Sequence, residues 1–238
     1  MAGSSRGSRP VVVTVCVAVG LTVLALAGAV LLRPHSAAPA ATGSPGAARP
    51  AVSSGLAATL QCDSGPCQLL ASRSVSGSTV QLLANSAATS GRVRISTGQG
   101  LDSVFETTIS NLGASLTAQS LTCVDGQTSA CLVSGTAPDG TAGEVFINTG
   151  GDWSRADAPY FSSAGYLGLT GSSTPPEIIT AQSDCDSDLT TQCAQSPVYV
   201  EVFTVTGQSI GCSRSVSRLD RLPGWPTVSV ARDSLHPC

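Results

Sequence analysis

The sequence has no lysine, one methionine, two histidines and few aromatic residues, and only 11% of its 238 residues are charged. This charged fraction is well below the quarter that is usual for soluble domains, so Ser, Thr, Gly and Ala must form much of the surface. All twelve cations are arginine, which indicates GC-rich coding rather than a binding function. His35 lies in a Pro- and Ala-rich segment and His236 lies near the C-terminus, which argues against Ser-His-Asp and Cys-His catalysis.

Clustered cations of the kind that bind nucleic acid are also missing. Residues 1–33 carry three arginines and no acidic residue, whereas residues 34–238 carry nine arginines and fifteen acidic residues. Binding to a phosphate backbone requires a basic patch. We therefore expect no nucleic-acid partner, and no residue pattern predicts a cofactor.

One long uncharged run stands near the N-terminus. Residues 11–32 carry no charge, and a helix of that length spans roughly 33 Å, enough to cross a bilayer core. Arg6 and Arg9 precede the run, which favours a cytoplasmic segment over residues 1–10. The sequence therefore predicts a transmembrane signal anchor. A cleaved signal peptide is the alternative, because residues 25–27 could serve as an Ala-x-Ala cleavage site.

The cysteines indicate an oxidising compartment. Cys16 lies within the predicted anchor and is most simply an apolar filler. Eight cysteines follow the anchor: Cys62, Cys67, Cys123, Cys131, Cys185, Cys193, Cys212 and Cys238. An even set behind an export signal is typical of disulfides, whereas zinc sites use closer Cys-x-x-Cys pairs and histidines. We expect a single-pass protein of the cell membrane whose C-terminal domain lies outside the cytoplasm.

The external part divides into a tether and a domain. Residues 33–58 are rich in Ala, Pro, Ser and Gly and have no periodic apolar face, which is typical of a disordered linker. Residues 59–238 contain short β-leaning runs between turn residues: CQLLAS, STVQLLA, RVRIS, CLVSGTA, GEVFIN, YLGLT and VYVEVFTV. Runs of this length and spacing predict antiparallel strands. The predicted fold class of the domain is all-β.

Internal repetition is the most informative feature of this domain. Cys62, Cys123 and Cys185 follow one another at separations of 61 and 62 residues. The segment LTAQS precedes the second of these cysteines, and ITAQS precedes the third. A repeat of about 60 residues forms one supersecondary unit. The domain is therefore predicted to contain three antiparallel repeats, approximately at residues 59–115, 116–178 and 179–238.

The repeat register favours local disulfides. Each of the three cysteines is followed by another after a short loop, and one pair remains for the C-terminal part. The predicted pairs are Cys62–Cys67, Cys123–Cys131, Cys185–Cys193 and Cys212–Cys238. Eight cysteines allow 105 pairings, and only the repeat register favours this set among them. The last pair would fasten the C-terminus to the third repeat.

A turn in the second repeat links these units to a known family. The segment GEVFINTGGDW contains a strand that leads into Asn148–Trp153. It resembles the BNR or Asp-box repeats of sialidase-like β-propellers, in which a strand leads into a Ser-x-Asp-x-Gly-x-x-Trp turn. The match is shortened and lacks the aspartate at its usual place, and the related segments ISTGQG and VTGQSI lack the tryptophan. The resemblance covers about 175 residues and implies propeller blades.

This resemblance leaves three arrangements open. Four strands in roughly 60 residues make an ordinary blade, but closed propellers usually have four to eight blades. Three repeats could form a partial wheel with capped edges, or two chains could complete one ring as a homodimer. A packed β-sandwich that shares the hairpin pattern is the third arrangement.

Two groups of residues are candidates for a binding surface. Many of the few aromatic residues of the domain lie in or after the Asp-box-like turn. They could contact a glycan or peptide, or they could form the core between blades. Three arginines beside Asp220 could bind an anionic envelope polymer or could form a solvated strand edge. The candidates are Trp153, Tyr160, Tyr166, Arg214, Arg218 and Arg221.

Acidic residues offer the remaining chemistry. The resemblance implies a sialidase-type site with three arginines, a tyrosine–glutamate pair and an acidic aspartate, but no FRIP-like motif places such residues here. A glycoside-processing enzyme is therefore the alternative function. The acids considered for its site are Asp125, Asp139, Asp152 and Glu144. Acids also alternate within residues 184–188 as in a calcium loop, but Leu189 replaces the required glycine, so no metal site is predicted.

The first hypothesis from the sequence is a binding or scaffold module of the cell envelope, without catalytic activity. Propeller-like folds present loops to many kinds of partner, so this step rests on the fold. The expected contacts are the membrane, through residues 11–32, and an envelope protein or a glycan.

Overall fold

The computed structural model describes residues 60–63, 65–98, 102–171, 175–185 and 196–238. The predicted cytoplasmic segment, anchor and linker lie outside these ranges. Within the ranges, no helix is long and apolar enough to cross a membrane. The regular elements found there are β-strands and short 3-10 helices, which confirms the all-β prediction for the domain.

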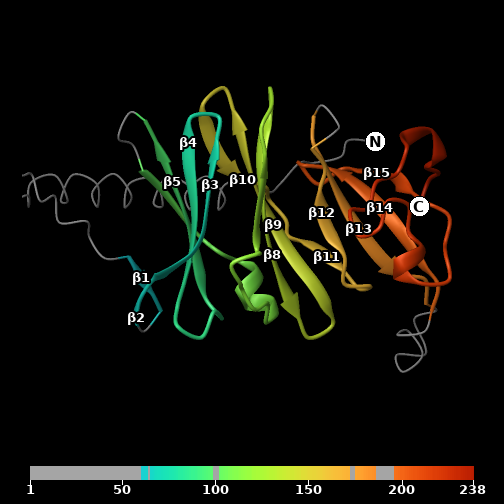
Figure 1. Cartoon of the computed structure of the whole chain (residues 1–238), viewed down its shortest axis with the longest axis horizontal. Coiled ribbons are helices and arrows are strands. Elements are labelled where there is room, and N and C mark those ends of the chain that lie inside the picture. Colours follow the sequence, from blue (N-terminus) through green and yellow to red (C-terminus); the bar gives the residue numbers. More distant parts are fainter. Residues whose placement is uncertain (1–59, 64, 99–101, 172–174, 186–195) are drawn as a thin grey trace, which may run out of the picture. The chain divides into compact units, whose positions relative to one another are not determined.

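The first sheet is a four-stranded antiparallel meander, in the order β3-β4-β5-β6 (Figure 1). Its strands are β3 (Gln68–Val75), β4 (Ser78–Ala84), β5 (Gly91–Thr97) and β6 (Asp102–Glu106). β4 and β5 alternate buried and partly exposed residues, so one face of the sheet carries the apolar side chains. A separate hairpin of β1 (Gln61–Cys62) and β2 (Gly65–Pro66) precedes this sheet.

The second and third sheets repeat the meander. The second consists of β7 (Leu121–Val124), β8 (Ser129–Ala137), β9 (Gly140–Thr149) and β10 (Asp152–Arg155), with β11 (Tyr160–Ser162) also paired to β9. The third consists of β12 (Leu167–Leu169), β13 (Glu177–Ser183), β14 (Val198–Thr204) and β15 (Ser209–Cys212). All seven β-leaning runs of the sequence lie largely within these strands, because the strands bury alternate or successive apolar residues.

The sheets pack against one another in chain order. One apolar cluster joins the first and second sheets and includes Leu82 and Phe146. Another joins the second and third sheets and includes Val145 and Ile178. Val145 and Phe146 of β9 thus face different neighbours, because successive side chains point to opposite faces of a strand. The central sheet is therefore buried on both faces, which explains its long apolar runs.

Residues 213–238 cover the other face of the third sheet (Figure 1). Leu222 and Val228 are buried in the apolar cluster that contains Val200 of β14. This cap holds two short 3-10 helices, η3 (Leu219–Arg221) and η4 (Arg232–Ser234). The disulfide between Cys212 and Cys238 fastens its end.

The solvated strand edge considered for the three arginine candidates is wrong. This part of the cap contains no strand, and its backbone pairs with the sheet only at a bridge between Val198 and Val216. The arginines therefore lie on an irregular segment, because the apolar side chains of the cap, rather than a hydrogen-bonded ladder, hold it on the sheet.

Three of the four predicted disulfides lie within the described residues: Cys62–Cys67, Cys123–Cys131 and Cys212–Cys238. Cys185 is disulfide-bonded too, while Cys193 lies outside the described residues. Cys123 and Cys131 face each other across β7 and β8, whereas Cys62 lies in β1, beside the first sheet. The cysteine pairs therefore occupy different positions relative to their sheets.

The third sheet begins before the third cysteine repeat. Its first strand, β12, starts at Leu167, and residue 179 lies inside β13. β12 belongs to the third sheet because it pairs forward with β13. Hydrogen bonding between neighbouring strands, rather than cysteine spacing, thus sets the limits of each sheet.

Candidate functional site

A cleft of about 620 Å³ opens between the hairpin ends of the first and second sheets. Its volume falls in the range of ligand pockets in proteins. The walls are formed by Ser76, Gly77, Ser78, Thr97, Gly98, Ser103, Asn148, Gly150, Gly151, Asp152 and Trp153. Thr97 and Gly98 belong to the segment ISTGQG of the first repeat, and they line the same cleft as residues of the related segment INTGGDW of the second repeat.

The β3–β4 turn forms one wall of the cleft. Its two central residues, Ser76 and Gly77, have φ values of 47° and 71°. This combination is typical of a two-residue type I′ hairpin, whose twist matches that of the strands. A serine in the left-handed region is uncommon, so neighbouring contacts must hold Ser76 in place.

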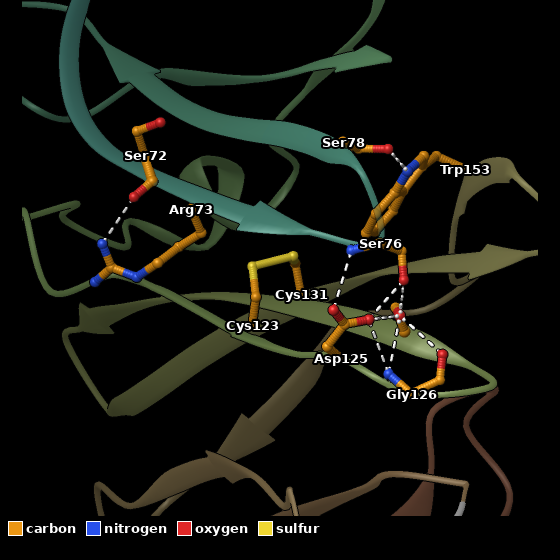
Figure 2. The surroundings of a disulfide bond; sticks show 10 residues. Ser72, Arg73, Ser76, Ser78, Cys123, Asp125, Gly126, Cys131 and Trp153 are labelled. Atoms are coloured by element: carbon orange, nitrogen blue, oxygen red, sulfur yellow. Dashed lines mark hydrogen bonds between the residues drawn. A yellow bond between two sulfur atoms is a disulfide. The ribbon is translucent and has the colours of Figure 1, made fainter. Parts of the chain in front are cut away.

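Asp125 supplies those contacts from the second sheet, as Figure 2 shows. Its carboxylate accepts hydrogen bonds from the Ser76 hydroxyl at 2.6 Å and the Ser76 backbone N–H at 3.3 Å. It also accepts from the Ser129 hydroxyl and the Gly126 N–H, each at 2.9 Å. These bonds, the Ser76 hydroxyl first, lower the pKa of Asp125 to about 2. Asp125 is therefore an ionised anchor that ties the first sheet to the second.

The Cys123–Cys131 disulfide closes the loop that carries this anchor (Figure 2). The two cysteines are directly paired on β7 and β8, so the loop between them, with Asp125 and Ser129, is short and closed at its base. The disulfide therefore positions one wall of the cleft as well as joining two strands.

Trp153 lines the cleft from the second sheet and is also part of the core. Ser129, Asn148 and Trp153 are aligned across β8, β9 and β10, so they share the face of the second sheet that looks at the first. The Trp153 Nε1–H donates to the Ser78 hydroxyl at 3.1 Å (Figure 2). The ring is partly buried and packs against the apolar cluster between the two sheets. One part of the Trp153 side chain thus belongs to the core, and another part lines the cleft.

Glycines leave the backbone of the cleft open. A Cβ atom added at Gly77, Gly98, Gly150 or Gly151 would meet no atom within 4 Å. Gly98 does not adopt a left-handed φ, so neither crowding nor backbone conformation requires glycine there. Its missing side chain instead leaves space at the rim.

The acids considered for catalysis do not converge in this cleft. Asp152 is the only carboxylate among the described residues that line it. Asp139 and Asp152 flank opposite ends of the ten-residue strand β9, which places them roughly 30 Å apart at ~3.3 Å per residue. Asp125 is held by the Ser76 turn and lines no wall.

Glu144 is buried between the first two sheets, away from the cleft. Only 1% of it is exposed. Its Oε2 accepts hydrogen bonds from the Thr108 backbone N–H at 3.1 Å and the Thr108 hydroxyl at 2.8 Å, and lies 3.9 Å from Arg155. Its Oε1 has no hydrogen-bond partner among the described residues. Burial raises the pKa of Glu144, against the lowering effect of its partners.

The two tyrosine candidates have structural roles. Tyr160 is buried between the second and third sheets and donates its hydroxyl to the Thr204 carbonyl at 2.8 Å. Burial raises its pKa to about 12. Tyr166 packs under the cap, where its hydroxyl accepts from the Val228 N–H at 3.0 Å, and burial raises its pKa. Neither tyrosine lines the cleft with Trp153.

The three arginine candidates lie on the cap of the third sheet. Arg214 and Arg221 are exposed, and Arg218 forms an ion pair with Asp220. None of them lines the cleft between the first two sheets. The structure therefore separates the six candidates into the cleft, the core and the cap.

One cluster of metal-ligand types occurs among the described residues. It consists of Glu201, Cys212 and Cys238. The two sulfur atoms are bonded to each other, so they offer no thiolate to a metal ion. In the acidic segment, Asp184 accepts from the Ser215 hydroxyl at 2.7 Å, and residues 186–188 lie outside the described part.

Sequence reasoning missed the hydroxyl residues of the cleft. Ser76 and Ser78 come from the first sheet, while Asp125 and Trp153 come from the second. The dipeptide Ser-Gly between two strand patterns marks the turn, but no local signal shows which loop it meets.

No protein-family model, no curated protein and no solved structure matches this chain. The geometry of the cleft therefore carries the functional argument.

Proposed function

We propose that this chain is a membrane-anchored binding module of the cell envelope, which presents the cleft between its first two sheets to an extracytoplasmic partner. The observation that carries the proposal is the cleft itself. It has the volume of a ligand site, an indole in one wall and glycine turns at its rim.

The carboxylates favour binding over catalysis. Glycoside hydrolases need two carboxyl groups about 5–9.5 Å apart across the scissile bond. Among the described residues the cleft offers Asp152 alone, and Glu144 is buried outside it. No observation therefore favours the alternative of a glycoside-processing enzyme.

Two features support a location outside the cytoplasm. Disulfides persist in oxidising compartments, and Cys62, Cys123 and Cys212 are all disulfide-bonded. The uncharged residues 11–32 have the length of a membrane span. In this proposal residues 33–58 hold the domain away from the membrane.

The sheet arrangement supports a propeller-like scaffold. Each of the three sheets contains a four-stranded meander, as in a propeller blade, and in the second sheet β11 pairs with β9 as a fifth strand. Successive sheets share apolar clusters, and residues 213–238 cover the third sheet. We propose a partial wheel whose last blade is capped by the C-terminal segment.

A paired substitution at two open glycines tests the proposed binding function. Gly98→Phe places a ring at the rim of the cleft, while Gly65→Phe places the same ring on β2, where a Cβ also has free space and φ is ordinary. We expect full-length wild type and Gly65→Phe, in their native membrane, to crosslink the same envelope component. Gly98→Phe should capture at least about tenfold less, which corresponds to 1.4 kcal/mol.

Equal capture by all three proteins would contradict the proposal, as would the absence of any captured component. Thermal unfolding of the two variants, measured in parallel, shows whether both are folded.

A further inference from the structure

We infer that the ligand of the cleft is a neutral oligosaccharide, with one sugar ring stacked on Trp153. This inference rests on the proposed binding function and adds the chemical class of the ligand. It follows from the ring, the polar groups, the charge and the open space of the cleft.

The indole of Trp153 is a fixed platform. Its N–H is bound to the Ser78 hydroxyl, and part of the ring is packed in the core, so the ring cannot turn freely. The remainder borders the cleft. Sugar rings present a face of C–H groups that stacks on an aromatic surface, with hydroxyls around the edge. An immobile indole therefore suits a sugar with little loss of side-chain entropy.

Polar groups around this platform match the hydroxyls of a sugar. Asp152 neighbours Trp153 in the chain, and its carboxylate forms no hydrogen bond or ion pair with the described residues. Its carboxylate can accept hydrogen bonds from two sugar hydroxyls. The Oδ1 of Asn148 accepts from the Gly151 N–H at 3.0 Å, so its amide NH₂ remains as a donor. Donors and acceptors thus lie on the same side as the ring.

The charge of the cleft excludes anionic sugars. No arginine is among the described residues that line the cleft, and the chain has no lysine. Asp152 would repel a carboxylated, sulfated or phosphorylated sugar. Recognition of such groups normally uses arginine forks. The ligand should therefore carry no net charge.

Open backbone at the rim provides room for a chain of sugars. Nothing lies within 4 Å of a Cβ position at Gly98, Gly150 or Gly151. A concave site of about 620 Å³ suits a small or linear ligand, whereas a protein partner usually covers about 800 Å² of a flatter surface. These features favour an oligosaccharide over a protein as the occupant.

Trp153 itself can report the binding. The chain has only two tryptophans, and Trp225 lies in the cap, 40% exposed. The variant Trp225→Phe leaves Trp153 as the sole indole fluorophore. We would titrate full-length Trp225→Phe, in lipid nanodiscs without sugar-based detergent, with neutral gluco-, manno- and galacto-oligosaccharides. Oligogalacturonate and sialyllactose serve as anionic comparators.

We expect at least one neutral series to give a saturable change in Trp153 fluorescence, with affinity that rises with chain length. Anionic sugars should bind at least about tenfold more weakly. Adding Gly98→Phe should weaken binding by about tenfold or more, while adding Gly65→Phe should leave it unchanged. Asp152→Asn should weaken binding and reduce the discrimination against anionic sugars.

No response to any neutral series would overturn the inference, and so would tighter binding of the anionic sugars. The crosslinking experiment separates this failure from failure of the proposed function. If Gly98→Phe abolishes capture of an envelope component but neutral sugars do not compete with it, the cleft is a binding site for another class of ligand. If capture does not depend on Gly98, both conclusions fail.

Discussion

Tyr160 and Trp153 lie at the two interfaces between sheets and differ in how far they are buried. Between the second and third sheets, Tyr160 is 5% exposed and its hydroxyl binds a backbone carbonyl, so the interface is closed. Between the first and second sheets, Trp153 is only partly buried and its N–H binds the hydroxyl of Ser78 at the edge of a cleft. The same pairing of meanders thus gives a structural contact in one place and an open site in the other.

Polar contacts reinforce this difference. The first interface is crossed by hydrogen bonds that Ser76 donates to Asp125 and that Thr108 donates to Glu144. These bonds link the two sheets in addition to the apolar cluster that the sheets share. A rigid gap between sheets can then persist without collapse, which is what a preformed binding site requires.

The largest expected effect is a loss of stability, and it should differ between Tyr160 and Trp153. Tyr160→Ala removes a buried ring from the closed interface and should lower the free energy of unfolding by about 3–4 kcal/mol. Trp153→Ala should lower the free energy of unfolding by about half as much, because part of the ring is exposed. Chemical denaturation of the full-length protein, followed by circular dichroism, measures both values. Equal losses would show that the cleft interface is as closed as the other.

Removal of the disulfide in the second sheet and removal of the disulfide beside the first sheet should have different effects. The double substitution Cys123→Ser and Cys131→Ser opens a short loop and should cost about 2 kcal/mol. It should also weaken ligand capture, because the loop carries the Asp125 anchor. The matched change at Cys62 and Cys67 should reduce stability without affecting capture. Loss of capture in both variants would remove the special role of the β7–β8 loop.

Acid should loosen the cleft through Asp125. Its pKa is about 2 in the folded protein and 3.8 without partners. Because the pKa is lower in the folded protein, the ionised carboxylate of Asp125 stabilises the fold above about pH 4. This contribution to stability is lost as the pH falls through about 2. Asp125→Asn should therefore have a lower melting temperature than wild type at pH 5, and the two should converge toward pH 2. A constant difference across this range would contradict the anchor role.

Replacement of Glu144 should give the smallest change in stability, and the change should be a gain rather than a loss. Its pKa is raised above 4.5 by burial, so its protonated form is favoured in the fold. The contribution to stability is present below about pH 4.5 and is lost as the pH rises through the folded pKa. Glu144→Gln should be more stable than wild type at pH 7 by about 0.5–1 kcal/mol. Melting curves of both proteins at pH 4 and pH 7 would contradict this if the advantage of Glu144→Gln over wild type did not increase at the higher pH.

The sequence predicted the strands well because they follow simple physical patterns. β4 and β5 alternate buried and partly exposed residues, and turn residues separate them. The disulfides at Cys62, Cys123 and Cys212 followed from the repeat register and from the pair that remained. The cap was missed, since residues 213–238 pack through scattered apolar side chains and contain no regular strand.

Sequence reasoning found one wall of the cleft and not the other. Trp153 and Asp152 stand in a recognisable turn, but Ser76 of the other wall was not considered, because its partner Asp125 lies 49 residues away in the chain. Tyr160 also looked like a surface candidate, although it is buried. Which aromatic residue becomes core depends on the packing of whole sheets, and local sequence does not contain that information.

Oxidative footprinting of the two tryptophans tests the central claim most directly. The full-length protein, in its own membrane, would be oxidised by hydroxyl radicals with and without a soluble extract of the cell envelope. Trp153 borders the cleft and Trp225 is exposed on the cap, so each chain contains its own control. We predict that the extract protects Trp153 and leaves the oxidation rate of Trp225 unchanged. Protection of Trp225 alone, or of neither tryptophan, would contradict the account.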